Sequence, residues 1–194
     1  FRVYEVDDVG AQYGSSVACL GDATGDGFDD IAVGAPNYGA DDIGAVFSYK
    51  GSATGPPSGG ANRTLLGDLA DNGGFGGAVA GAGDINGDGL QDLIVGSSLF
   101  ANGQSNEGRI LIYPGAPGGL STDPTTIIES NVAGARFGYT VSTAGDVNGD
   151  GFDDVLVGAF RFSNGQSLEG KAFLYLGSAA GLSTTPAWQV EGEP

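Results

Sequence analysis

The stretch DINGDGLQDLIVGS at residues 84–97 decides the fold, because in it an acidic, glycine-rich loop runs directly into a short apolar strand. The same pattern recurs as DATGDGFDDIAVGA at residues 22–35 and as DVNGDGFDDVLVGA at residues 146–159. The three copies are 62 residues apart. A fixed period of this length indicates an array of similar structural units.

The second unit shows the strand pattern that all three units share. A small-residue segment at 78–82 precedes the acidic loop, and the apolar segment 93–95 follows it. After a long polar loop come residues 109–113 and 125–130, which are rich in β-branched and aromatic residues and so favour strands. Glycine and proline interrupt the chain too often for helices of ordinary length. The sequence therefore predicts an all-β fold with four short strands per unit.

Units of this kind are typical of antiparallel β-propeller blades, of which about 4 to 8 close a ring. We assign residues 11–68, 69–130 and 131–194 to three blades, which form an incomplete ring as a single chain. Residues 1–10 are expected to be the last strand of a preceding blade, since FRVYEV at 1–6 aligns with the fourth strand of the last unit. The chain is either an excerpt of a longer propeller or associates with copies of itself, because open sheet edges invite pairing.

Composition excludes several functional classes. Among the 194 residues, 24 are acidic and 7 basic, and the net charge of −17 disfavours binding to nucleic acid or to anionic membranes. No run of apolar residues is long enough for membrane insertion. Histidine is absent, and the single cysteine, Cys19, is expected to be a small core residue. Outside the acidic loops no catalytic constellation remains, so the chain is not expected to be an enzyme.

The acidic loops have the spacing of a calcium site. Side-chain oxygens at loop positions 1, 3, 5 and 9 and a backbone carbonyl at position 7 can surround an ion that takes 6 to 8 oxygen ligands. Valine stands at position 12, where an EF-hand requires glutamate. The alternative is a metal-free turn rich in Asx residues. We predict three calcium ions, one per repeat, held by Asp22, Thr24, Asp26, Phe28 and Asp30; by Asp84, Asn86, Asp88, Leu90 and Asp92; and by Asp146, Asn148, Asp150, Phe152 and Asp154.

The first site should bind calcium most weakly, because the hydroxyl of Thr24 replaces the amide carbonyl that asparagine supplies in the other loops. Three aspartates within nine residues also repel one another unless a cation joins them. Tyr49, Tyr113 and Tyr175 end the third strands at equivalent positions, and we expect them, and Trp188, to pack between blades.

These motifs resemble FG-GAP repeats, which form the propeller blades of integrin α-subunits and of many bacterial surface proteins. The resemblance covers essentially the whole chain and is carried by Phe75-Gly76, Phe137-Gly138, the acidic loops and Gly-Ala-Pro at 34–36. Three departures are Tyr13-Gly14 in the first unit, Gly-Ser-Ser at 96–98 and Gly-Ala-Phe at 158–160. The resemblance implies a calcium-rigidified propeller whose partners dock on the face opposite the metal loops.

On that face the resemblance places the loops 37–43, 99–107 and 161–169. Two of these loops carry a matching set of aromatic and amide residues that could contact a polar ligand, namely Phe100, Asn102, Gln104, Phe162, Asn164 and Gln166. The alternative is turn chemistry with a packing aromatic. The expected partner is an extracellular protein or glycan.

The leading interpretation is thus a secreted or cell-surface module for adhesion or recognition. Two alternatives remain open. One is a non-catalytic accessory domain of a larger secreted enzyme, and the other is a structural element that assembles through its open blade edges.

Overall fold

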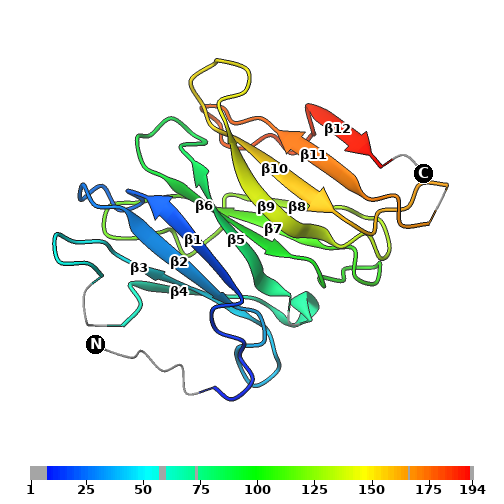
Figure 1. Ribbon diagram of the computed structural model, residues 1–194, viewed down its shortest axis with the longest axis horizontal. Coiled ribbons are helices and arrows are strands. Elements are labelled where there is room, and N and C mark those ends of the chain that lie inside the picture. Colours follow the sequence, from blue (N-terminus) through cyan, green and yellow to red (C-terminus); the bar gives the residue numbers. More distant parts are fainter. Residues whose placement is uncertain (1–7, 57–59, 73, 166, 193–194) are drawn as a thin grey trace.

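The computed structural model describes residues 8–56, 60–72, 74–165 and 167–192. These residues form three four-stranded antiparallel sheets that stand side by side like the blades of a fan (Figure 1). The strands are β1 (Ser16–Gly21), β2 (Asp30–Ala35), β3 (Ala45–Tyr49) and β4 (Arg63–Leu66); β5 (Phe75–Gly83), β6 (Asp92–Ser97), β7 (Arg109–Tyr113) and β8 (Thr126–Glu129); β9 (Phe137–Gly145), β10 (Asp154–Ala159), β11 (Lys171–Tyr175) and β12 (Trp188–Glu191).

Within each sheet the strands follow one another in chain order, so every connection is a hairpin. The first strands of the three sheets lie next to each other, with β5 in contact with both β1 and β9. This arrangement confirms the predicted all-β fold of three blades without a closed ring. In the described part of the chain the one helical element is the short 3-10 turn η1 (Leu69–Asp71), which connects the first sheet to the second. No helix among these residues has the length and apolar character required to cross a bilayer.

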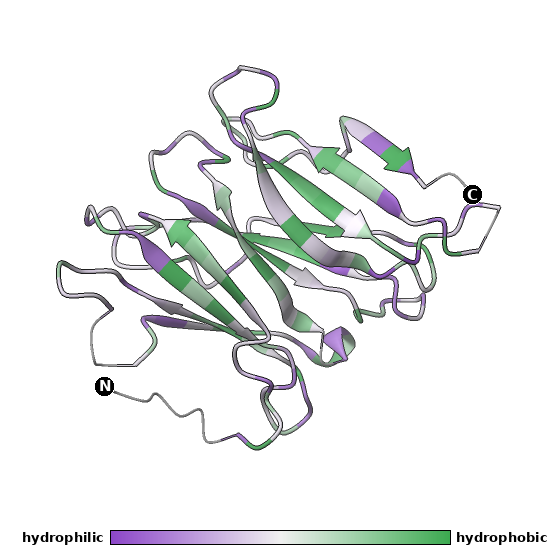
Figure 2. Ribbon diagram, viewed as in Figure 1, coloured by the Kyte–Doolittle hydropathy of each residue, from purple (hydrophilic) through white to green (hydrophobic). Residues whose placement is uncertain are grey.

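The hydrophobic core lies between the sheets. On one side of the second sheet Ile94, Ile110 and Ile112 pack against residues of the third sheet that include Val157 and Phe173. Figure 2 shows the corresponding hydrophobic bands along the middle strands. Because alternate residues of a strand point to opposite faces, strands β6 and β7 supply both interfaces and are buried on both sides.

At the two sheet interfaces, the Phe-Gly motifs of the second and third blades meet Gly34 and Gly96 of the preceding blades. Phe75 and Phe137 are completely or almost completely buried. A Cβ atom built on Gly96 would lie 2.0 Å from the carbonyl oxygen of Gly138, and one on Gly34 would lie 2.0 Å from that of Gly76. Since such a distance is far inside van der Waals contact, glycine is required for the backbones of neighbouring blades to come this close.

Two expectations for single residues are wrong. Cys19 is exposed, because the face of β1 that it shares with Val17 has no described sheet beside it. The equivalent of Val17 in the second sheet, Val79, is buried against the first sheet. Trp188 is 51% exposed at the outer strand of the last sheet, whereas the three strand-ending tyrosines are buried as expected.

Replacing Gly96 with alanine should lower the free energy of unfolding by about 1–3 kcal/mol, because the new methyl group must displace the Gly138 carbonyl. The matched control is Gly158→Ala, at the equivalent position of the last sheet. There the added carbon would chiefly meet the Thr140 hydroxyl, which can rotate away. Urea denaturation of both variants provides the measurement, and equal losses of stability would contradict the proposed close approach.

Candidate metal centres

Each acidic loop is the hairpin between the first and second strands of its sheet. In the second loop Gly87 and Gly89 have φ angles of 75° and 88°, a left-handed conformation that glycine adopts without strain. The glycines at the same positions of the other two loops have similar angles. These paired left-handed residues curl the chain, so that the side chains at positions 1, 3 and 5 lie on the inside of the turn.

The aspartate at position 1 organises the loop by accepting backbone hydrogen bonds. Asp84 Oδ1 accepts from the amides of Gly87 at 2.7 Å and Asp88 at 3.1 Å, and its Oδ2 accepts from Gly89 at 2.9 Å. The same set recurs around Asp22 and Asp146. Backbone hydrogen bonds, led by that of Gly151, lower the pKa of Asp146. The Asp146 carboxylate is therefore held in its charged form.

The aspartate at position 9 is buried at the base of each loop. Asp92 Oδ2 accepts from the Ile85 amide at 3.1 Å and Oδ1 accepts from the Gly115 amide at 2.9 Å, which ties the loop to the end of β7. Asp30 and Asp154 make the equivalent pairs of bonds. Burial raises the pKa of Asp92 to about 6, and the charges of Asp88 and Asp84 add to the effect. A cation at this loop would offset both the burial of the Asp92 carboxylate and its repulsion by Asp88 and Asp84.

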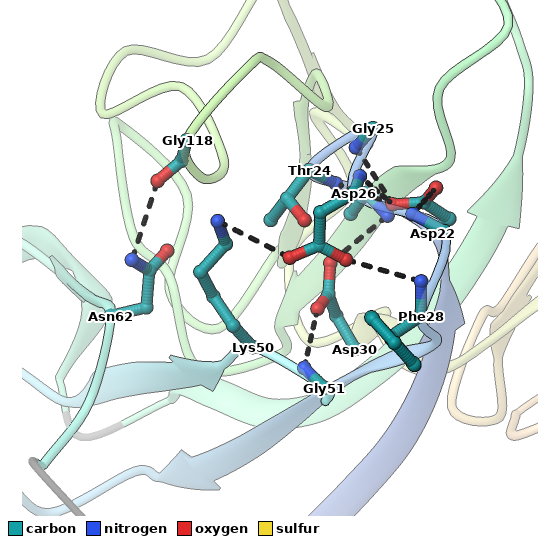
Figure 3. A network of polar contacts seen from close by, with 12 residues as sticks. Asp22, Thr24, Gly25, Asp26, Phe28, Asp30, Lys50, Gly51, Asn62 and Gly118 are labelled. Carbon is teal, nitrogen blue, oxygen red and sulfur yellow. Dashed lines mark hydrogen bonds and ion pairs between the residues drawn. The ribbon is translucent and has the colours of Figure 1, made fainter. Parts of the chain in front are cut away.

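Positions 3 and 5 face each other across the second and third loops. Asn86 Nδ2 donates to Asp88 Oδ2 at 3.0 Å, and Asn148 Nδ2 donates to Asp150 Oδ2 at 2.8 Å. The first loop differs, as Figure 3 shows, because the Thr24 hydroxyl is buried beside Asp30 without a hydrogen bond of normal geometry. In this loop Asp26 Oδ2 instead lies 3.4 Å from the ammonium group of Lys50.

The donor chemistry of the loops fits a hard divalent cation, since carboxylate, amide, hydroxyl and carbonyl oxygens are the available ligands. Within the described residues, however, no three acidic or sulfur- and imidazole-bearing side chains converge closely enough to form a ready-made metal site. The carboxylates at positions 1 and 9 are turned toward backbone amides. Coordination by the fifteen residues named above thus stays a prediction.

The first and second acidic loops also join neighbouring blades. The carbonyl of Asp84 accepts a hydrogen bond from the Asp153 amide at 3.1 Å, and that of Ile85 accepts from Ser178 at 3.1 Å. The first loop makes the same two contacts with the second blade, where Gln91 and Ala116 are the donors. In addition, the Asp84 amide donates to the Asp153 carboxylate at 2.8 Å. A change in loop shape would therefore change the contact between two blades.

The candidate partner loop of the second blade, which contains Phe100 and Asn102, lies at the opposite end of its sheet. Phe100 is only 3% exposed, and the Arg109 guanidinium stacks over its ring at 4.0 Å. The Asn102 amide nitrogens reach two glutamates, with the backbone N–H donating to Glu107 at 2.7 Å and Nδ2 to Glu129 at 3.3 Å. These contacts tie the loop to the sheet below it.

The third blade repeats this arrangement. Phe162 lies 4.6 Å below the ammonium group of Lys171, and Asn164 donates to Glu169 and Glu191. Gln104 is partly buried, with no hydrogen-bond partner for its Oε1 atom, and Gln166 lies outside the described residues. Partner binding by the six aromatic and amide residues of these two loops remains a prediction, although the Phe100 side chain is almost completely buried.

The structure also contains a buried ionic cluster that was not predicted from the sequence. Arg109 donates from Nε and Nη2 to the two carboxylate oxygens of Asp71 at 3.0 and 2.8 Å, and Nη2 also reaches Asp68 at 2.9 Å. Ser97 donates a further hydrogen bond to Asp71, which is fully buried. The cluster anchors the turn η1 to the second blade. The sequence signal that could have indicated this cluster is Arg109, a charged residue at the start of the otherwise apolar strand β7.

Comparison with known proteins places this geometry in a family. A sequence model described as an FG-GAP-like repeat matches residues 84–157, and one described as an FG-GAP repeat matches residues 13–49, together more than half of the chain.

Three relatives are integrin α-subunits. Integrin alpha-IIb of Mus musculus is 34% identical over 165 residues, which are 81% of this chain and 16% of the relative. Integrin alpha-3 of Cricetulus griseus is 35% identical over 166 residues, which are 81% of this chain and 15% of the relative. Integrin alpha-5 of Xenopus laevis is 26% identical over 191 residues, which are 93% of this chain and 17% of the relative. The chain thus spans less than a fifth of the length of these relatives, and it belongs to the FG-GAP repeat family as an integrin-α-like propeller module.

Proposed function

We propose that this chain is a calcium-stabilised propeller module that serves extracellular adhesion or recognition and performs no catalysis. The observation that carries the proposal is the threefold repetition of one loop geometry, in which positions 1, 5 and 9 of a single tight turn are all aspartates that accept backbone hydrogen bonds. In the first two loops this turn also joins two blades. The similarity to integrin α-subunits supports an extracellular or cell-surface location.

Calcium would act on the module by removing charge repulsion at the joints between blades. The net charge of −17 would fall to −11 with one ion in each of three loops. Aspartates at positions 1 and 9 would add their remaining lone pairs to those of positions 3 and 5 and to the position-7 carbonyl. We propose the ranges 11–68, 69–130 and 131–194 as the units stabilised in this way, while the strand expected within 1–10 falls largely outside the described residues.

The proposed partner is an extracellular protein or glycan that docks at the blade ends opposite the metal loops. There the hairpins between β2 and β3, between β6 and β7 and between β10 and β11 come together on one side of the molecule. Loops held by a rigid scaffold are common sites of recognition. We assign the polar side-chain groups of Asn102, Gln104 and Asn164 to contact with this partner.

Chelation of calcium with EGTA should lower the thermal unfolding midpoint, because an ion that binds only the folded state stabilises that state by mass action. For a domain of this size we expect a decrease of about 5 °C or more. Differential scanning calorimetry in calcium and in excess EGTA measures the difference, and magnesium in place of calcium serves as the control. Identical midpoints in all three buffers would contradict the proposal.

Asp88→Ala should weaken the second site, because it removes the position-5 carboxylate from a loop whose other ligands cannot replace it. At free calcium about a hundredfold above the dissociation constant, the loss of one site should cost about 2–3 kcal/mol of stability. Asp123→Ala is the matched control, since Asp123 is an exposed aspartate in the connection between β7 and β8. Isothermal titration should show one calcium ion fewer for the first variant alone. An equal loss in both would refute the site assignment.

A further inference from the structure

Lys50 distinguishes the first acidic loop from the other two. It follows directly after β3, at the position that Pro114 occupies after β7 and Leu176 after β11. Its ammonium nitrogen lies 3.4 Å from Asp26 Oδ2, as Figure 3 shows. In the second and third loops the same oxygen of the position-5 aspartate accepts a hydrogen bond from an asparagine amide. The first loop thus contains a full positive charge where the others contain a neutral donor.

Both members of this pair are partly shielded from solvent, with exposed side-chain fractions of 27% for Lys50 and 33% for Asp26. Partial shielding strengthens the attraction relative to a pair on the open surface. The other aspartates of the loop have different partners, since Asp22 and Asp30 accept hydrogen bonds from backbone amides. The ammonium group therefore contacts the loop carboxylate that a calcium ion would need at position 5.

The spaces next to the first and second loops also differ. Beside the second loop a cavity of ≈ 300 Å³ between the second and third blades is lined by Asn86, Asp88, Asp92 and Pro114. The equivalent space beside the first loop, lined by Thr24, Asp30 and Lys50 among others, has no room for a water molecule. The second loop can thus be reached by an ion through an open cavity, whereas the side of the first loop is closed.

We propose that Lys50 is a tethered counter-ion of the first loop, which holds that loop in shape without metal and competes with calcium for Asp26. This inference rests on the proposed function, and it adds that the response to calcium resides mainly in the second and third loops. It also gives an electrostatic reason, beyond the threonine at position 3, for a weak first site.

The test uses Lys50→Leu in the full chain, because leucine is the residue that the third blade has at this position. The variant should bind its weakest calcium ion about two- to five-fold more tightly in isothermal titration, as expected for the removal of a partly exposed competing charge. It should also melt at a lower temperature than the wild type in EGTA. The reciprocal variant Leu176→Lys should weaken calcium binding at the third loop, and it keeps the test available if the first variant does not fold.

Lys171→Leu is the matched control. Lys171 pairs with Glu191 at 2.8 Å near the opposite end of the third sheet, so its loss should leave all calcium affinities unchanged. Unchanged affinities and an unchanged EGTA melting temperature in Lys50→Leu would overturn the counter-ion role. Absence of calcium binding in the wild type would instead contradict the proposed function. In that case the melting temperature of Lys50→Leu in EGTA still decides the role of Lys50, because a decrease supports it and no change refutes it.

Discussion

The architecture depends on the close approach of one blade's backbone to the next. Carbonyl groups at the first two positions of the first and second acidic loops accept hydrogen bonds from the following blade, as Asp84 and Ile85 do from Asp153 and Ser178. At the other end of the interface, Gly34 in β2 and Gly96 in β6 allow close contact with the Phe-Gly segment of the next blade. These backbone contacts leave little room for adjustment. The shape of the acidic loops therefore sets how adjacent blades are arranged.

This constraint explains why the negative charges lie where they do. Aspartates curl each loop by accepting hydrogen bonds from backbone amides. Burial raises the pKa of Asp92, and the negative charges of Asp88 and Asp84 in the same loop add to the effect. A cation at the joint between two blades would offset this repulsion. In the first loop Lys50 already supplies a positive charge. Among the described residues, no basic side chain forms an ion pair with the aspartates of the other two loops. Calcium would in this way stiffen the surface formed by the loops at the opposite end.

The 62-residue period made the fold predictable, because it aligned four strands and one acidic loop in each of three units. The surroundings of individual side chains were harder to predict from the sequence. Cys19 looked like a core residue, but whether its face is covered depends on a neighbouring sheet and not on the local pattern. The Asp71–Arg109 pair joins residues 38 positions apart that belong to no shared motif. Phe100 resembled a contact residue because an aromatic in a polar loop has the same sequence pattern whether it is exposed or stacked beneath an arginine.

Cation binding at the acidic loops should be transmitted to the contacts between blades. Hydrogen exchange measured by mass spectrometry, with calcium and with EGTA, tests it most directly on the amides of Asp153 and Ser178, which donate to the second loop. Calcium should slow exchange at these amides more than at strand amides in the middle of β11. Equal protection of the interblade amides in both conditions, despite calcium bound to the chain, would contradict it.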